Sequence, residues 1–401
     1  LKHHLMVGRR LCLSIQIIPH MILQQNLLTS LVLVRKRMNR LVLQQRSVSN
    51  LMETFTHHPD VTLLQYQSYD PTKPYFPIYY NDVYKVTLPK GHRFPMKKYQ
   101  QVRDIVQQKL SSTSPMTQFH VSPLVSWDDL IITHDPNYVE RFLRGSITDS
   151  ELRTMGFPWS RSGVERALSS TGGTVAAACS VCEAKNQQQH QTTEKSYYPI
   201  WGAHLAGGTH HAFYDRGEGF CVFSDIAVAA NVVRRNYPFI QRILIIDLDV
   251  HQGNGNAVLF QGREDVVTFS MHCEGNYFSQ KETSDLDVEL PIGCSDEAYV
   301  ATLRHWLKQI EKLGGTFDLV FYQAGVDILG CDRLGRMNLT SSGVTERNKL
   351  VFEFCHKHKI PLVITMGGGY PRSDDWTPIL QAHAGVYLEA HQYLMDIMEG
   401  R

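Results

Sequence analysis

Acidic residues are missing from the first 52 positions of this 401-residue chain, which hold eight lysine or arginine residues and no aspartate or glutamate. Over the remaining positions, 39 acidic residues outnumber 32 basic ones, which gives that part a net charge of −7. A mildly acidic body has no bulk electrostatic attraction to nucleic-acid phosphates. We therefore expect no direct nucleic-acid partner.

Long apolar runs are also scarce. The stretch 11–34 has no charged residue, but polar or helix-breaking residues interrupt it at Gln16, Pro19, His20, Gln24, Gln25 and Asn26. It is too broken for a transmembrane helix and lacks the cleavage site of a secretory signal peptide. Two interpretations of residues 1–52 stay open. A transit peptide would direct the chain to a mitochondrion or plastid; a disordered extension, or sequence that precedes the true start, would leave it in the nucleus or cytoplasm.

Cysteine is too sparse for a disulfide scaffold, with eight in the chain, so we expect reduced thiols. Cys179 and Cys182 form a C-x-x-C motif that continues a helically spaced apolar stripe. No second C-x-x-C is present to complete a zinc site. We expect these two thiols to pack in a core; a redox or zinc role is the alternative.

Neither an internal repeat nor a linker interrupts residues 75–395. Residues 53–74 are expected to be a linker that leads into one folded domain at 75–401. The apolar content of 43% and charged content of 20% are ordinary for a globular protein.

Strand and helix patterns alternate along this domain. Strands are expected at 243–249, 266–272, 317–324 and 361–366, and helices at 99–110, 164–183, 225–235, 297–313 and 343–358. Such alternation is typical of an α/β fold whose parallel strands are joined by crossover helices. The polar, Gln-rich stretch 186–196 is expected to be a surface loop.

The stretch 243–256, ILIIDLDVHQGNGN, joins an apolar strand pattern to three residues of metal-ligand type. Four apolar residues lead to Asp247, Asp249 and His251 at every second position, so these side chains point the same way if the strand continues. Buried carboxylates and imidazoles are costly unless something pairs them. A divalent metal is one such partner, and a strand-end ion-pair cluster is the alternative.

Three further stretches carry polar groups at strand ends: GGTHH at 207–211, FDLVFYQAGVD at 317–327 and PLVITMGGGYP at 361–371. In an open parallel sheet, function gathers outside the carboxyl ends of the strands. This favours a metal site in which Asp249, His251 and Asp327 leave a fourth position open, as in catalytic zinc sites.

Proton-transfer candidates lie in the same stretches. His210 and His211 are suited to proton transfer at neutral pH, although two plain core or surface histidines are the alternative. Tyr370 is a candidate hydrogen-bond donor to a developing oxyanion. Gly367, Gly368 and Gly369 would let the backbone approach the site.

These motifs, and the order in which they occur along the chain, resemble those of the zinc-dependent histone deacetylases. The resemblance covers residues 75–393 and rests on GGTHHAF, GEGFCVFSDIAVAA, IDLDVHQGNG, YQAGVDILGCDRLG and GGGYP. The variants HRFPM, GFPWS and DVHQGNG are similar to the class IV branch.

The resemblance implies an arginase-like α/β fold and hydrolysis of N6-acyl-lysine in histones or other proteins. It implies Zn²⁺ at Asp249, His251 and Asp327, with Fe²⁺ as an alternative. His211 would act as general base and then acid, His210 would support it, and Tyr370 would polarise the acyl carbonyl.

The resemblance also implies a narrow tunnel for the lysine stem, lined by Gly219, Phe220 and Phe278, with Leu334 at its rim. It suggests a structural K⁺ near Asp247 and Ser270.

One departure from the family pattern concerns Asn254, where many relatives carry aspartate. Asp247 can still pair with His210. Asn254 can orient His211 but cannot stabilise its imidazolium by charge, so we expect His211 to be less basic than in those relatives.

Alternatives remain for the substrate. Class IV relatives resemble long-chain deacylases as much as deacetylases, in which case the GFPWS loop and Met155 would line an acyl channel. An acetylpolyamine hydrolase would carry an acidic residue at the tunnel rim. A ureohydrolase would need further carboxylates to hold two metals. A non-catalytic scaffold is the last alternative, but it would not need the competent residues that fill every expected catalytic position.

Overall fold

Eight parallel strands form one sheet in the computed structural model, and the carboxyl ends of its strands carry the candidate site. The strands are β1 Phe76–Tyr80, β2 Thr117–Val121, β3 Trp201–His204, β4 Ile243–Asp247, β5 Val266–Cys273, β6 Leu286–Leu290, β7 Leu319–Gln323 and β8 Leu362–Thr365. Their order is β2-β1-β3-β8-β7-β4-β5-β6, and every neighbouring pair is parallel. The predicted α/β fold with a single parallel sheet is confirmed.

The structure describes residues 47–61, 73–110, 117–191, 199–276 and 280–401. Residues 57–401 form one unit, and of the preceding unit the structure describes only 47–56, which begin with helical residues 47–52. The transit-peptide and linker predictions fall largely on residues outside these ranges and stay predictions. None of the described helices is long and apolar enough to cross a membrane.

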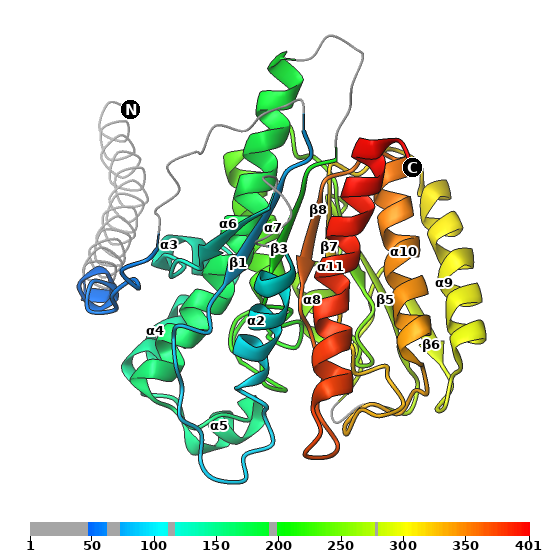
Figure 1. Ribbon diagram of the computed structural model, residues 1–401. Helices are drawn as coiled ribbons and strands as arrows, with labels where there is room; N and C mark the ends of the chain where they lie inside the picture. Colours follow the sequence, from blue (N-terminus) through cyan, green and yellow to red (C-terminus); the bar gives the residue numbers. More distant parts are fainter. Residues whose placement is uncertain (1–46, 62–72, 111–116, 192–198, 277–279) are drawn as a thin grey trace, which may run out of the picture. The chain divides into compact units, whose positions relative to one another are not determined.

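Helices connect the strands and cover the sheet. They are α2 Lys98–Leu110, α3 Trp127–Leu130, α4 Pro136–Arg144, α5 Asp149–Met155, α6 Arg161–Gln191, α7 Asp225–Asn236, α8 Asn254–Leu259, α9 Asp296–Ile310, η1 Glu311–Leu313, α10 Ser341–Lys357 and α11 Thr377–Glu399. Figure 1 shows α9, α10 and α11 side by side. The five helices expected from the sequence are all present.

Both faces of the sheet are buried, as the apolar strand sequences require. On β4, Leu244 and Ile246 join a core formed with α2, α9, α10 and α11, whereas Ile243 and Ile245 join a core formed with α6 and α7. Successive side chains of a strand point to opposite faces, so the run ILII feeds both cores.

Two local expectations were wrong. Residues 186–191, expected in a loop, continue α6 to Gln191. The strand expected at 243–249 ends at Asp247, so Asp249 and His251 lie in the loop that follows and strand alternation does not set their direction. Cys179 and Cys182 are on α6 and pack in the core without a disulfide, as expected.

A short helix beside the site is defined by its caps. Thr148 accepts a hydrogen bond from the backbone of Glu151, whose side chain bonds back to Thr148, and this capping box starts α5. Gly156 ends α5 with a φ of +83°. A Cβ there would lie 2.9 Å from the Phe220 ring. The glycine therefore lets the GFPWS loop pass close to a wall of the candidate site.

Candidate active site and metal centre

Three ligand-type side chains meet beyond the carboxyl ends of β4 and β7. Asp249 and His251 follow β4, and Asp327 follows β7. One ligand atom from each lies within 4.8 Å of the others. Nδ1 of His251 is 3.2 Å from Oδ1 of Asp249 and 3.3 Å from Oδ2 of Asp327. The structure thus brings together the three residues that the sequence suggested as metal ligands.

Backbone groups hold the two carboxylates in place. Oδ2 of Asp249 accepts a hydrogen bond from the Gly368 N–H at 2.7 Å, and Oδ1 of Asp327 accepts one from the Val250 N–H at 3.0 Å. Among the described residues, the buried Oδ2 of Asp327 has no well-directed hydrogen-bond donor. A buried carboxylate oxygen left without a donor, beside a second carboxylate and an imidazole, fits a divalent cation.

The electrostatics of the group point the same way. Burial, and after it the negative charge of Asp249, raises the pKa of the Asp327 carboxyl to about 7. Two adjacent buried carboxylates need a positive partner if both are to be ionised at neutral pH. Zn²⁺ suits two carboxylate oxygens and one imidazole nitrogen, and Fe²⁺ accepts the same donors.

The backbone of the glycine run after β8 passes so close to the ligand carboxylates that a side chain would not fit there. A Cβ on Gly368 would lie 2.0 Å from Oδ2 of Asp327 and 2.8 Å from Oδ2 of Asp249. Gly367 adopts a φ of +68°, where other residues are strained. The run therefore brings a backbone N–H to Asp249 and places Tyr370 beside the ligands.

His210 is paired with a carboxylate. Its Nδ1 lies 2.6 Å from Oδ2 of Asp247, at the end of β4. Burial alone would lower the pKa of His210, but Asp247 and then Asp249 outweigh it and raise the pKa to about 9. His210 is therefore an imidazolium at neutral pH.

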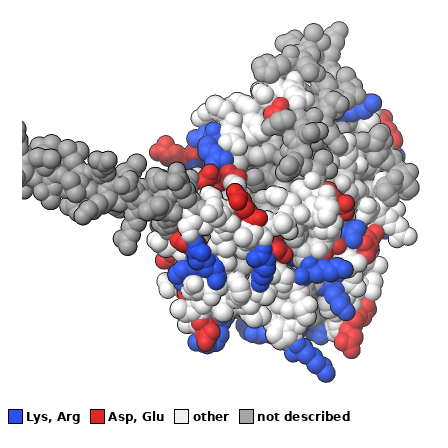
Figure 2. All heavy atoms as spheres, turned by 90° about the vertical axis from the view of Figure 1, so that its left-hand side faces the viewer, with Lys and Arg blue, Asp and Glu red and all other residues white. Residues whose placement is uncertain are grey.

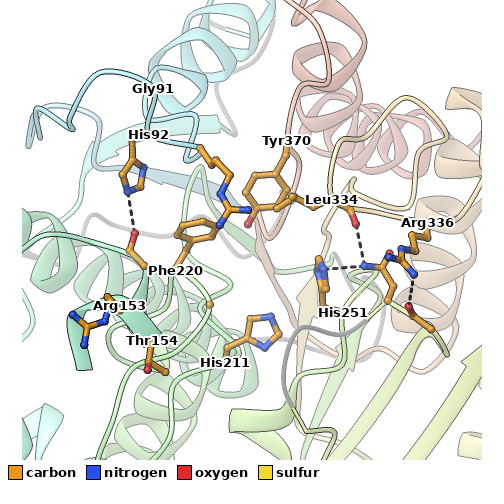
Figure 3. A pocket seen from close by; sticks show the side chains of 15 residues that line it. Gly91, His92, Arg153, Thr154, His211, Phe220, His251, Leu334, Arg336 and Tyr370 are labelled. Atoms are coloured by element: carbon orange, nitrogen blue, oxygen red, sulfur yellow. Dashed lines mark hydrogen bonds between the residues drawn. The ribbon is translucent and has the colours of Figure 1, made fainter. Parts of the chain in front are cut away.

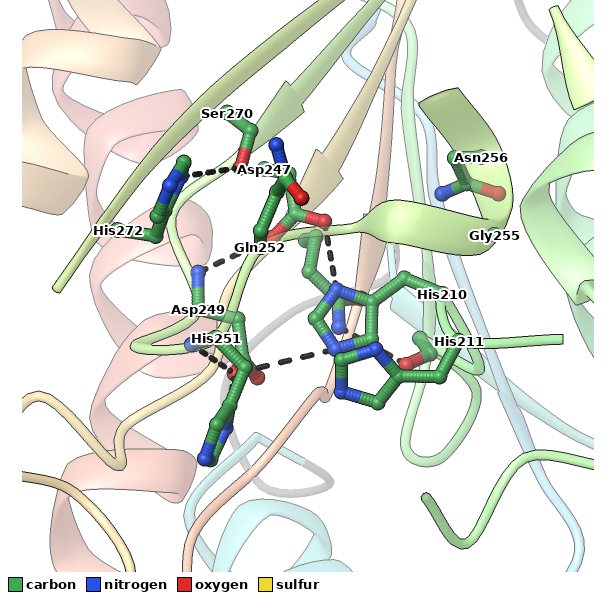
Figure 4. A network of polar contacts seen from close by, with 12 residues as sticks. His210, His211, Asp247, Asp249, His251, Gln252, Gly255, Asn256, Ser270 and His272 are labelled. Atoms are coloured by element: carbon green, nitrogen blue, oxygen red, sulfur yellow. Dashed lines mark hydrogen bonds and ion pairs between the residues drawn. The ribbon is translucent and has the colours of Figure 1, made fainter. Parts of the chain in front are cut away.

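His211 is paired with an amide instead. Its Nδ1 lies 2.7 Å from Oδ1 of Asn254, whose amide nitrogen faces Glu218 at 3.4 Å. An amide oxygen only accepts, so Nδ1 of His211 carries the proton and Nε2 is left to accept one. Burial, followed by the charge of His210, holds the pKa of His211 well below its usual value. Figure 4 shows the two imidazoles side by side, facing Asp249 and His251.

Tyr370 closes the opposite side of the site. It is buried, and its ring lies 6.0 Å from the ring of Phe220. Burial raises the pKa of its phenol well above the usual value. The hydroxyl is therefore protonated at any working pH and can donate a hydrogen bond.

Two residues that the sequence reasoning did not single out hold the Tyr370 segment. The fully buried Lys98 donates from Nζ to the carbonyls of Gly367 and Gly369 at 3.3 and 3.1 Å. The carboxylate of Asp332 accepts from the Tyr370 N–H at 2.6 Å. The aspartate belongs to the CDRLG stretch of the quoted motifs, whereas a lone lysine before an amphipathic helix carries no sequence signal of burial.

A cavity of about 690 Å³ leads from the surface to His211, His251 and Tyr370. Gly219, Phe220 and Leu334 line it, as expected for tunnel residues. Phe278 lies outside the described residues, so its placement stays a prediction. Figure 3 shows Phe220 on one side of the cavity, with Tyr370 and Leu334 across from it.

Phe220 takes its position from an unusual backbone conformation. Its φ is +67°, and Gly219 before it has a φ of +55°. Left-handed backbone at a bulky residue is costly and is kept where the surroundings fix it. Contacts of the Phe220 ring with the tilted rings of Phe94 and Phe157, at centroid distances of 5.2 and 5.5 Å, supply that support.

The predicted monovalent-cation site includes Asp247, the carboxylate that pairs with His210. Asp247 and Ser270 are direct neighbours across β4 and β5. Oγ of Ser270 hydrogen-bonds to Nδ1 of His272 at 3.0 Å, and Oδ1 of Asp247 accepts from the Asp249 N–H at 3.2 Å. The two residues are therefore adjacent, and K⁺ binding there stays a prediction.

Comparison with known proteins adds an independent finding. A family model described as a histone deacetylase domain matches residues 92–384. An uncharacterised protein of Picosynechococcus sp. is 38% identical over 298 residues, which cover 74% of this chain and 93% of that protein. Histone deacetylase 2 of Arabidopsis thaliana is 30% identical over 264 residues, which cover 63% of this chain and 64% of that protein.

Among solved structures, the crystal structure of the HDA15 HD domain matches with a TM-score of 0.59 at 18% identity, covering 81% of this chain and 94% of that chain. At that identity the match shows likeness of fold. The family match, in contrast, spans more than half of the chain and includes the ligand group, both histidines and Tyr370. The chain belongs to the histone deacetylase family.

Proposed function

We propose that this chain hydrolyses the amide of acylated lysine side chains in proteins or peptides, with a divalent metal, Zn²⁺ in the first place, held by Asp249, His251 and Asp327. The observation that carries the proposal is the meeting of that ligand group with His211 and Tyr370 at the end of one cavity. A metal bound there would polarise the acyl carbonyl and make a water more acidic.

The chain's own residues would divide the remaining work. Nε2 of His211 would take a proton from the attacking water and deliver it to the departing lysine amine. Its Nδ1 proton is fixed by Asn254, so the ring presents the correct nitrogen. The imidazolium of His210 would stabilise negative charge nearby, and the Tyr370 hydroxyl would donate to the carbonyl oxygen as charge develops on it.

We propose acetyl-lysine as the first substrate to test, with longer acyl chains second. A separate apolar cavity shares Phe220 with the tunnel and is also lined by Met155, Phe157 and Trp159. These are the walls expected for an acyl channel. Its volume is about 80 Å³, so a fatty chain would fit only if these side chains moved apart.

We also propose that the chain belongs to the class IV branch. The HRFPM, GFPWS and DVHQGNG variants support this proposal, and the first two contribute Phe94 and Phe157 to the ring contacts that hold Phe220.

Other substrates are less consistent with the site. An acetylpolyamine is cationic, whereas no carboxylate among the described residues lines the cavity and three arginines do. A ureohydrolase would need a second metal, and within the described residues one ligand group is found. A scaffold role would not explain why the metal-ligand residues, His210 and His211 lie together at the end of a cavity.

The full-length chain should be assayed with acetyl-lysine peptides, myristoyl-lysine peptides and acetylated polyamines in parallel. The proposal predicts turnover of a peptide and none of the polyamine, and the ratio of the two peptide rates sets the acyl preference. Turnover of the polyamine alone would overturn the proposal in favour of a small-molecule amidohydrolase.

A further inference from the structure

The mouth of the catalytic cavity is positively charged. Arg93, Arg153 and Arg336 line it, all three are exposed, and no aspartate or glutamate does so in the part of the chain that is described. Figure 3 shows Arg153 and Arg336 on opposite sides, with His211, His251 and Tyr370 between them. Three elements far apart in the sequence thus each place one cation around a single entrance.

None of these three charges has an acidic partner within the described ranges. Among the described residues, no carboxylate oxygen lies within 4.0 Å of the three guanidinium groups. Arg336 donates from Nη1 to the Gly275 carbonyl at 3.1 Å, a neutral partner. Some exposed arginines elsewhere do pair with carboxylates: Arg144 pairs with Glu140 at 2.9 Å and Arg235 pairs with Asp129.

The nearest acidic residues in sequence do not line the entrance. Glu151, on α5 beside Arg153, is already paired with Arg141 at 2.8 Å. Asp149 lines a separate depression that it shares with Arg153. Glu274 precedes Gly275 but does not line the cavity.

The positive field extends beyond the mouth. Arg93 also lines a neighbouring cavity of about 1070 Å³ together with Arg333 and Arg372, which donate to the backbone carbonyls of Arg93 and Asp332 respectively. Two aspartates, Asp82 and Asp374, line this cavity as well, so basic residues outnumber acidic ones in its wall. Figure 2 shows several Lys and Arg side chains in the lower half of the face that looks left in Figure 1, with Asp and Glu side chains between them.

These positions decide which part of a substrate the arginines meet. An acylated lysine side chain is neutral, and the tunnel that would take it is walled by Phe220 and Leu334. Groups at the mouth would lie against the residues on either side of that lysine. Guanidinium groups prefer carboxylates, which they bind with paired hydrogen bonds, and like charges at an interface are strongly disfavoured.

We propose, on the basis of the proposed function, that the substrate is an acyl-lysine flanked by acidic residues in a peptide or protein. Lys- and Arg-rich tails, such as the basic histone termini, are disfavoured substrates. Arg93, Arg153 and Arg336 determine this specificity by contacting carboxylates on both sides of the acyl-lysine.

The test uses three peptides with the same central acetyl-lysine and with Glu, Gln or Lys at the two positions on either side. The full-length, zinc-loaded chain should give a kcat/KM for the Glu peptide that exceeds that for the Lys peptide by at least about tenfold at low salt. The ratio should shrink when the salt concentration is raised to about 0.5 M, because screening weakens interactions between exposed charges.

Charge reversal locates the effect. Arg153→Glu and Arg336→Glu should each lower the Glu-to-Lys ratio by about threefold or more, and the double variant should reverse the preference. Arg304→Glu is the matched control, because Arg304 is exposed on α9 and lines none of these cavities; its ratio should equal that of the wild type.

The outcomes separate this inference from the proposed function. Equal turnover of all three peptides, or a preference for the Lys peptide, overturns the charge specificity and leaves the deacylase function standing. No turnover of any peptide by zinc-loaded protein overturns both. A preference for Glu that Arg153→Glu and Arg336→Glu leave unchanged overturns the assignment to these arginines.

Discussion

At the scale of single residues, the two adjacent histidines differ because their partners differ. Asp247 raises the pKa of His210 to about 9, whereas burial and then the charge of His210 hold the pKa of His211 well below its usual value. The neutral partner Asn254 opposes that lowering only through a hydrogen bond. A base with a low pKa is unprotonated over the whole neutral range. The acidic limb of the pH–rate profile should therefore lie at low pH.

Asn254→Asp should move that acidic limb to higher pH. A carboxylate at 2.7 Å from Nδ1 would stabilise the His211 imidazolium, so the pKa would rise and the free base would be lost at a higher pH. Glu218 lies 3.4 Å from the Asn254 amide and would repel the new carboxylate. Asn254→Asp combined with Glu218→Gln removes that repulsion and should still show the shift to higher pH. Unchanged limbs in both variants would contradict this account of His211.

The sequence sufficed for the chemistry-bearing residues but not for those that support them. Asp249, His251 and Asp327 could be predicted because each follows an apolar strand, and strand ends converge in a parallel sheet. The roles of Lys98 and of the arginines at the cavity mouth could not be predicted, because they depend on loops that meet only in the folded chain.

At the scale of elements, the loop after β8 is built around Gly368. Gly368→Ala should abolish binding of one zinc equivalent, because the new Cβ would overlap Oδ2 of Asp327. Zinc content of the purified variant measures this. Gly385→Ala on α11 is the control, since its Cβ would have no contact closer than 3.4 Å. Full zinc loading of Gly368→Ala would refute the assigned ligand geometry.

Lys98 ties α2 to the same loop. Lys98→Met would leave the carbonyls of Gly367 and Gly369 without their buried donor, at a cost of about 1–3 kcal/mol in the free energy of unfolding. We expect kcat to fall by about tenfold or more through misplacement of Tyr370, with zinc content and KM little changed. Lys98→Arg should restore much of the loss. A variant Lys98→Met with wild-type kcat would show that the contact is only structural.

The elements divide into those with clear patterns and those without. β4, β5, β7 and β8 are strongly apolar and were predicted, because both of their faces are buried. β1, β2, β3 and β6 were not: Trp201–His204 is only four residues long, and Thr117–Val121 and Leu286–Leu290 are polar, partly exposed edge strands. The extension of α6 was missed because its polar Gln run has no apolar periodicity.

At the scale of the whole molecule, topology assembles the site. β3, β4, β7 and β8 lie in the middle of the sheet, and the loops after their carboxyl ends supply, in chain order, the histidine pair, two metal ligands, the third ligand and Tyr370. Each loop follows a strand buried in two cores, so the positions of its polar residues are fixed by the most stable part of the fold.

The most direct measurement of the central claim is removal and restoration of the metal. Full-length protein would be stripped with a chelator, titrated with Zn²⁺ and assayed on an acetyl-lysine peptide at each step. The account predicts that activity is lost on stripping and returns in proportion to zinc up to one equivalent per chain. Hydrolysis that persists in fully stripped protein, or that fails to return although one zinc binds, would contradict a metal-dependent deacylase centred on Asp249, His251 and Asp327.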